Sequence, residues 1–185
     1  MGCTSTASAA LISRLGGLAV YDTDFNITWL KDANANGTMN WQAAKDWAAG
    51  LNVGGYTGWR LPNADPGCGA TYDCINSEVG HLFYTELGVQ ATRKITSSTS
   101  SYLALFTNVK DSTYWTGTEY ASRPSDAWGF DTSGGIQNFP YKGYDFYYAW
   151  AVRDGDVGSV PEPGILGLLG IGTLAWVTTC SRRKG

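Results

Sequence analysis

Residues 54–63 have the sequence GGYTGWRLPN, in which three glycines precede a strand-like Trp-Arg-Leu and a proline. Glycine accepts backbone angles that other residues avoid, so the glycines predict bends before the strand. Pro62 fixes the chain direction after it. The planar guanidinium of Arg60, with five donors, suits a bridge to carboxylates or backbone carbonyls. Glu78 and Asp154 are the candidate carboxylate partners of Arg60.

Two helices are predicted on either side of this stretch. Asn40 can cap a helix over residues 41–51, where apolar residues recur at spacings of three and four. Asn76 or Ser77 can cap a second helix that terminates at Gly88. Both helices present one apolar face toward a core.

The remaining patterns indicate short antiparallel strands. Residues 18–29 combine β-branched and aromatic residues around a polar turn, which predicts a hairpin. Shorter alternating runs follow near residues 114–120, 127–130 and 147–152. They carry Trp115, Trp128 and Trp150, for which core packing is the expected role. Two helices and several short strands predict one α+β domain over residues 12–157.

Composition supports one domain with tails and excludes several classes of protein. The chain has 185 residues, of which 16% are charged, with 24 glycines and eight tryptophans. An average soluble protein has roughly 25% charged residues. The net charge of −3 leaves no basic surface for phosphates, so no nucleic-acid partner is expected. This composition is typical of an exported bacterial module.

Cys68 and Cys74 are separated by five residues in a segment rich in turn formers. In an oxidising compartment such a pair predicts a local disulfide. A zinc site is the alternative, but His81 is the only histidine and zinc needs about four ligands. We therefore expect a disulfide, and neither a metal nor a cofactor.

The C-terminal residues 158–185 differ from the rest of the chain. Residues 164–180 carry no charge and, as a helix, would extend roughly 25 Å, which barely spans a bilayer. Arg182, Arg183 and Lys184 follow, and such a cluster stays on the cytoplasmic side. The pattern predicts a transmembrane helix with a cytoplasmic C-terminus; a buried C-terminal helix is the alternative.

The tripeptide Pro161-Glu162-Pro163, the apolar stretch and the basic end together resemble the PEP-CTERM sorting signal of Gram-negative bacteria. The resemblance implies cleavage by an exosortase-type membrane protease after transient anchoring in the inner membrane. It further implies release to the cell surface or extracellular matrix. Because the tail holds three of the thirteen cations, residues 1–163 retain ten cations against sixteen acidic residues, a net charge of −6.

Residues 1–11 lack the basic and apolar regions of a signal peptide. Residues 7–9 form the Ala-Ser-Ala pattern found where signal peptides end. We interpret residues 1–11 as the remnant of a signal peptide or the result of a misplaced start.

Five blocks of the body resemble the domain family found at the C-terminus of a bacterial collagen-like adhesin, originally classed as a domain of unknown function. The blocks are residues 20–30, 54–63, 76–88, 114–120 and 148–156. The resemblance implies a C-type-lectin-like fold, related also to formylglycine-generating enzymes. The motif residues, to which we assign structural roles, are Trp59, Arg60, Leu61, Pro62, Glu78, Trp115, Trp150, Arg153 and Asp154.

No enzyme activity is predicted. His81 has no nucleophile or orienting acid that the sequence reveals, so we expect a surface or hydrogen-bonded histidine. Residues 22–26 imitate the start of a calcium-binding EF-hand loop, but Ile27 occupies the position that requires glycine. A structural Ca²⁺ near Asp154 and Asp156 stays open as an alternative.

Two functions are compatible with these patterns. The first is a non-catalytic module that binds polysaccharide, for which a net charge of −6 favours neutral or basic glycans over sulfated ones. The second is a structural or protein-interaction protein of the envelope without a glycan site. The candidate ligand surface is the densest aromatic cluster: Tyr141, Tyr144, Phe146, Tyr147 and Tyr148.

Overall fold

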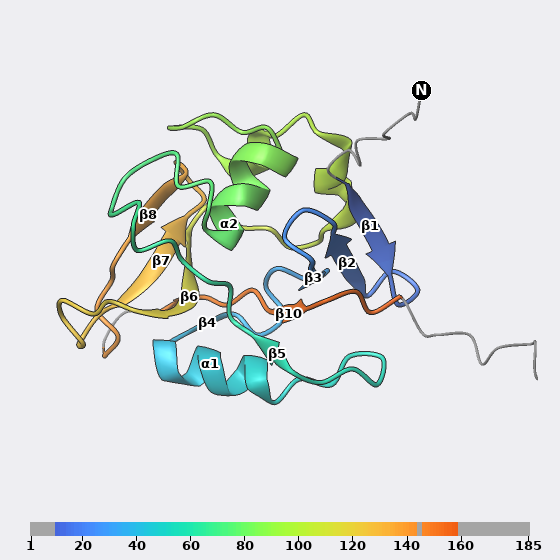
Figure 1. Ribbon diagram of the computed structural model, residues 1–185, viewed down its shortest axis with the longest axis horizontal. Helices are drawn as coiled ribbons and strands as arrows, with labels where there is room; N and C mark the ends of the chain where they lie inside the picture. The colour runs from blue at the N-terminus through green and yellow to red at the C-terminus, as the bar shows by residue number, and fades with distance from the viewer. Residues whose placement is uncertain (1–9, 144–145, 159–185) are drawn as a thin grey trace, which may run out of the picture.

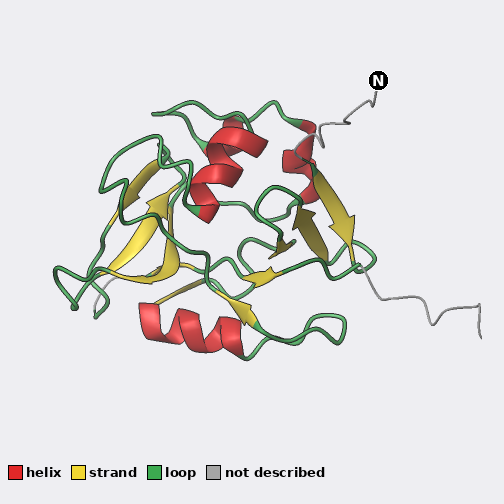
Figure 2. Cartoon of the chain, viewed as in Figure 1, coloured by secondary structure: helices red, strands yellow, loops and turns green. Residues whose placement is uncertain are grey.

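The computed structural model describes residues 10–143 and 146–158. This body is an α+β domain, as predicted, in which two five-stranded sheets lie beside each other and helices cover opposite sides (Figures 1 and 2). The predicted transmembrane helix 164–180 and the sorting signal lie outside the described residues. Within the described residues, no helix is long and apolar enough to span a membrane.

The first sheet joins the two ends of the body. Its strands occur in the order β1-β2-β3-β10-β5, and every neighbouring pair is antiparallel. The strands are β1 (Leu11–Arg14), β2 (Ala19–Asp22), β3 (Ile27–Leu30), β10 (Val152–Asp154) and β5 (Trp59–Arg60). The predicted hairpin is therefore β2 and β3.

The second sheet has the order β4-β9-β6-β7-β8. Its pairs are antiparallel except β6 and β9, which are parallel. The strands are β4 (Thr38–Met39), β9 (Tyr147–Tyr148), β6 (Thr113–Glu119), β7 (Ala127–Asp131) and β8 (Ile136–Asn138).

Both predicted helices are present. Helix α1 (Trp41–Ala49) begins after Asn40, whose side chain accepts from the Ala43 N–H. Helix α2 (Glu78–His81) is capped by Ser77 and continues as a π-helical turn, η1 (Leu82–Glu86). The sequence did not reveal this widened turn. Two 3₁₀ helices follow, η2 (Ile95–Ser97) and η3 (Ser101–Leu105).

The structure corrects one predicted strand and one boundary. Residues 147–152 were expected to form a single strand, but β9 and β10 belong to different sheets. The residues between them, including Trp150, are buried and carry the chain through the core from one sheet to the other. Leu11, which we placed in the N-terminal remnant, is buried in β1.

The core is contributed by the whole described body, from Leu11 to Val157. Trp115 and Trp150 are fully buried and Trp128 is 3% exposed, so the predicted core role of these three tryptophans is confirmed. Both ends of the body therefore supply residues to one hydrophobic core.

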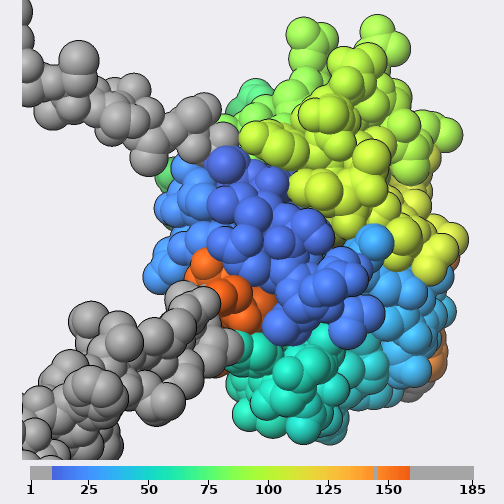
Figure 3. All heavy atoms as spheres, turned by 90° about the vertical axis from the view of Figure 1, so that its right-hand side faces the viewer, coloured from blue at the N-terminus to red at the C-terminus, as the bar shows by residue number. Residues whose placement is uncertain are grey.

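The two ends of the body are held together by an ion pair. Arg14 donates from Nε and Nη2 to the two carboxylate oxygens of Asp156, at 2.7 and 2.9 Å. Figure 3 shows the N-terminal strands and the C-terminal segment side by side on this face. The hydrogen bonds from Arg14 lower the pKa of Asp156 below its ordinary value.

This ion pair predicts a small loss of stability in acid. A carboxyl group with a lowered pKa stabilises the fold above its unfolded-state pKa, roughly 4, and loses that effect as pH falls through the folded-state pKa. Since both side chains are partly exposed, we expect Asp156→Asn to cost below about 1 kcal/mol at pH 6. Urea unfolding of both proteins at several pH values measures this. A difference that persists unchanged at pH 2 would contradict the assignment.

Candidate functional site

Arg60 connects three segments of the chain. Its Nη1 and Nη2 atoms donate to the two carboxylate oxygens of Glu78, both at 2.8 Å, and Nη2 also donates to Asp154. The predicted partnership of Arg60 with both carboxylates is confirmed. Burial alone would lower the pKa of Arg60, but the bonds to Glu78 and Asp154 raise it above its ordinary value.

The rest of the WRLP motif positions this bridge. Strand β5 places Trp59 and Leu61 in the core, and Arg60 between them at the sheet edge. The Pro62 carbonyl accepts from the Gly117 N–H at 2.8 Å, which ties the motif to β6. Gly58 has a φ of +78°, as the predicted bend requires. The arrangement supports a structural role for the motif.

The two carboxylates considered as calcium ligands, Asp154 and Asp156, each bind an arginine. Asp154 binds Arg60, and Asp156 binds Arg14. Arg153 points elsewhere, donating to the Thr57 carbonyl at 2.8 Å. Both carboxylates thus have an arginine partner, although Asp154 shares Arg60 with Glu78.

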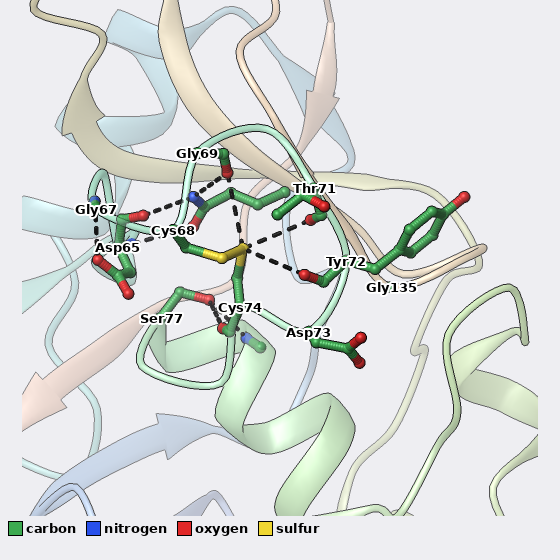
Figure 4. Close-up of a disulfide and its surroundings, with 12 residues drawn as sticks. Asp65, Gly67, Cys68, Gly69, Thr71, Tyr72, Asp73, Cys74, Ser77 and Gly135 are labelled. Atoms are coloured by element: carbon green, nitrogen blue, oxygen red, sulfur yellow. Dashed lines mark hydrogen bonds between the residues drawn. A yellow bond between two sulfur atoms is a disulfide. The ribbon is translucent and has the colours of Figure 1, made fainter.

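The predicted disulfide is present. Cys68 and Cys74 are bonded and close a loop beside the start of α2 (Figure 4). The carbonyl of Cys74 accepts from the hydroxyl of Ser77, the residue that caps α2. The disulfide loop is therefore coupled directly to the cap of the second helix.

The predicted aromatic cluster divides into two parts, and Tyr144 lies outside the described residues. Tyr147 and Tyr148 are half-buried in β9, where they pack against Trp115 and Tyr114 at ring distances of 5.2 and 5.7 Å. β9 lies between β4 and β6, and both of its tyrosines pack against the core cluster. These two residues therefore pack against the core while part of each stays exposed.

Tyr141 and Phe146 are exposed, at 43% and 59%. The structure adds two aromatic residues that the sequence analysis missed, Tyr120 and Phe139, whose half-buried rings stack at 4.4 Å. Asp126 forms an isolated β-bridge with Tyr141, and the Asp126 carbonyl accepts from the Tyr120 N–H. Through Asp126, the backbone at Tyr120 and the backbone at Tyr141 are brought together. We call Tyr120, Phe139, Tyr141 and Phe146 the aromatic surface.

His81 differs from our expectation. It is only 8% exposed, and its buried Nε2 atom has no hydrogen-bond partner among the described residues. Two carboxylates approach Nε2, from Glu86 at 3.4 Å and from Asp24 at 3.7 Å. His81 is thus neither a surface residue nor hydrogen-bonded at this atom, because the β2–β3 turn covers it.

Two carboxyl groups near His81, those of Glu86 and Asp22, have raised pKa values. Burial is the main cause that raises the pKa of Glu86 to about 7, and repulsion from Asp22 and Asp24 adds to it. Burial also raises the pKa of Asp22, although backbone N–H groups oppose the shift. Buried carboxyl groups with raised pKa values often mark functional sites.

These features define a class of protein: an exported-type α+β module with a disulfide, an arginine-centred structural motif and no assembled nucleophile–base pair among the described residues. The Lcl C-terminal domain model matches residues 18–153, and the chain belongs to that family. The PEP-CTERM protein-sorting motif matches residues 159–184. No curated protein gives a match.

The two matches agree with the resemblances noted in the sequence. The sorting motif identifies an exported protein that an exosortase processes after transient anchoring through its C-terminal region. The body is an envelope-related, adhesin-like domain.

Proposed function

We propose that the body binds a neutral or basic polysaccharide of the cell surface or matrix through the aromatic surface. The observation that carries the proposal is the exposure of two large rings, Tyr141 and Phe146, in the segment that follows the stacked ring of Phe139. The flat, apolar faces of exposed aromatic rings suit the apolar faces of sugars. The lectin-like resemblance of the family supports the same assignment.

Charge at this surface favours an uncharged or cationic glycan. Lys142 pairs with Glu119, and Arg123 pairs with Asp126, so nearby acidic groups compensate these cations. Lys142 also lies over the Trp41 ring at 4.2 Å. A sulfated chain would therefore meet few uncompensated cations in a domain whose net charge is strongly negative.

Retention of the body, residues 10–158, on a panel of neutral, basic and sulfated polysaccharides tests the proposal. We expect saturable binding to a neutral or basic member, weakened about three- to tenfold by Tyr141→Ala or Phe146→Ala. Tyr72→Ala is the matched control, because Tyr72 is an exposed ring, at 38%, in the disulfide loop.

Three results would contradict the proposal: no binding by folded, oxidised protein; equal weakening by Tyr72→Ala; or a preference for sulfated chains. Absence of binding would favour the second candidate, a structural envelope protein. The observation behind that candidate is the WRLP motif, whose Arg60 binds Glu78 and Asp154 of the same chain.

A further inference from the structure

Three side chains converge in a buried space between the β2–β3 turn and the second helix. Asp22 is fully buried at the end of β2, and His81 and Glu86 are 8% and 6% exposed. One ligand atom from each lies within 4.8 Å of the others. Figure 1 shows the turn after β2 next to α2.

Each of these side chains directs a buried atom without a hydrogen-bond partner into the same space. The atoms are Asp22 Oδ2, His81 Nε2 and Glu86 Oε1, and no described residue donates to or accepts from them. Buried polar atoms are nearly always paired, because an unpaired one loses its hydrogen bonds to water without replacement. Three unpaired atoms directed at one point indicate a missing common partner.

Charge identifies that partner as a cation. Among the described residues, His81 is the only basic side chain within ion-pair distance of Glu86 or Asp24. Two buried carboxyl groups and one imidazole leave little positive charge in this space, and burying a carboxylate without compensation is costly. A divalent cation would compensate it.

The fold orients the donors before any ion binds. Asp22 Oδ1 accepts from the N–H groups of Asp24 and Phe25, at 3.0 and 3.2 Å, which leaves Oδ2 directed inward. The Phe25 ring packs on the His81 imidazole with centroids 4.2 Å apart. Contacts of this type orient the residues that bind a metal ion.

The π-helical turn explains how His81 and Glu86 meet. In an α-helix, side chains five residues apart point about 140° away from each other. The widened turn, marked by the Leu87 N–H bond to the Leu82 carbonyl at 2.9 Å, brings residues five apart onto one face. π-helical turns are frequent at functional sites.

We propose that Asp22, His81 and Glu86 bind one divalent transition-metal ion of the Zn²⁺ or Mn²⁺ type. The 3.4 Å between His81 Nε2 and Glu86 Oε1 matches neighbouring donors of a tetrahedral ion, which lie roughly 3.3 Å apart when metal–ligand bonds are about 2.0–2.1 Å. The imidazole selects transition ions over Ca²⁺ and Mg²⁺, which prefer oxygen alone.

Asp24 lies on the solvent side of His81. Its Oδ2 lies 3.7 Å from His81 Nε2, and its side chain is 35% exposed. It adds negative charge beside the three donors, Asp22, His81 and Glu86. The ion would fasten the β2–β3 turn to the second helix, a role separate from the aromatic surface and independent of the proposed glycan binding.

Calorimetric titration of the untagged body, stripped with EDTA, tests the site with Zn²⁺, Mn²⁺, Ca²⁺ and Mg²⁺ separately. We expect one equivalent of Zn²⁺ or Mn²⁺ to bind and to raise the thermal midpoint. Glu86→Gln and His81→Gln should weaken binding by more than the roughly 10- to 100-fold typical of losing an outer-shell partner. Asp46→Asn, on the exposed side of α1, is the control and should bind as the parent does.

Glu86→Gln also separates loss of the ion from loss of the fold. Without metal, removing this buried charge should leave the thermal midpoint unchanged or higher, whereas with Zn²⁺ or Mn²⁺ only the parent should gain stability. No saturable transition-metal binding, equal binding by Glu86→Gln, or a preference for Ca²⁺ or Mg²⁺ would overturn the proposal.

Discussion

Replacement of Trp150 by alanine is expected to remove about 3–5 kcal/mol from the free energy of unfolding. The Trp150 ring is fully buried and lies against Trp29, Phe106 and Tyr114, at centroid distances of 5.1, 5.1 and 5.5 Å. Its Nε1–H also donates to the Leu30 carbonyl at 2.7 Å. Alanine would leave a large cavity where the chain crosses between the sheets and would remove the indole donor from the Leu30 carbonyl in β3.

Urea unfolding followed by far-UV circular dichroism measures this loss without depending on tryptophan fluorescence. Domains of this kind are stable by about 5–15 kcal/mol, so the variant would lose a large share of its stability. Trp47→Ala is the matched control: Trp47 is only half-buried on α1, and its loss should cost less than about 2 kcal/mol. Equal costs for the two variants would refute the central position assigned to Trp150.

Arg60→Met is expected to cost about 3 kcal/mol, because it leaves the carboxylate of Glu78 buried without its cation. The Glu78 side chain is 7% exposed, and without Arg60 it would retain the backbone N–H of Asn63 as its close donor. Methionine preserves most of the apolar part of the arginine side chain, so the loss of stability measures the effect of removing the positive charge. Urea unfolding at pH 7 measures the effect.

Two further variants separate the partners of Arg60. Asp154→Asn should cost less than about 1 kcal/mol, because the Asp154 side chain is 80% exposed and water replaces the arginine. Adding Glu78→Gln to Arg60→Met should recover part of the loss, since no buried charge is then left unpaired. If Asp154→Asn is as damaging as Arg60→Met, the buried carboxylate is not the cause.

Local patterns in the chain predicted those parts of the fold that depend on neighbouring residues. The caps at Asn40 and Ser77, the β2–β3 hairpin and the Cys68–Cys74 loop all involve groups a few residues apart. Residue type also predicted the partners of Arg60, because a guanidinium next to core residues requires carboxylates.

Local patterns did not predict the contacts between segments that are distant in the sequence. Tyr147 and Trp150 were read as one strand because periodicity cannot reveal that the chain changes sheets between them. The stacking of Tyr120 on Phe139 likewise depends on how the strand ends meet.

The site around His81 shows most clearly the difference between what local sequence patterns predict and what requires the tertiary structure. By themselves, the residues determined an α+β exported module with its motif, disulfide and sorting signal. Only the tertiary structure brought Asp22 to His81 across 59 positions, and only a π-helical turn brought Glu86 onto the same face. Spacing along the chain reports helix and strand periods, whereas a ligand set assembled from a turn and a widened helix follows neither period.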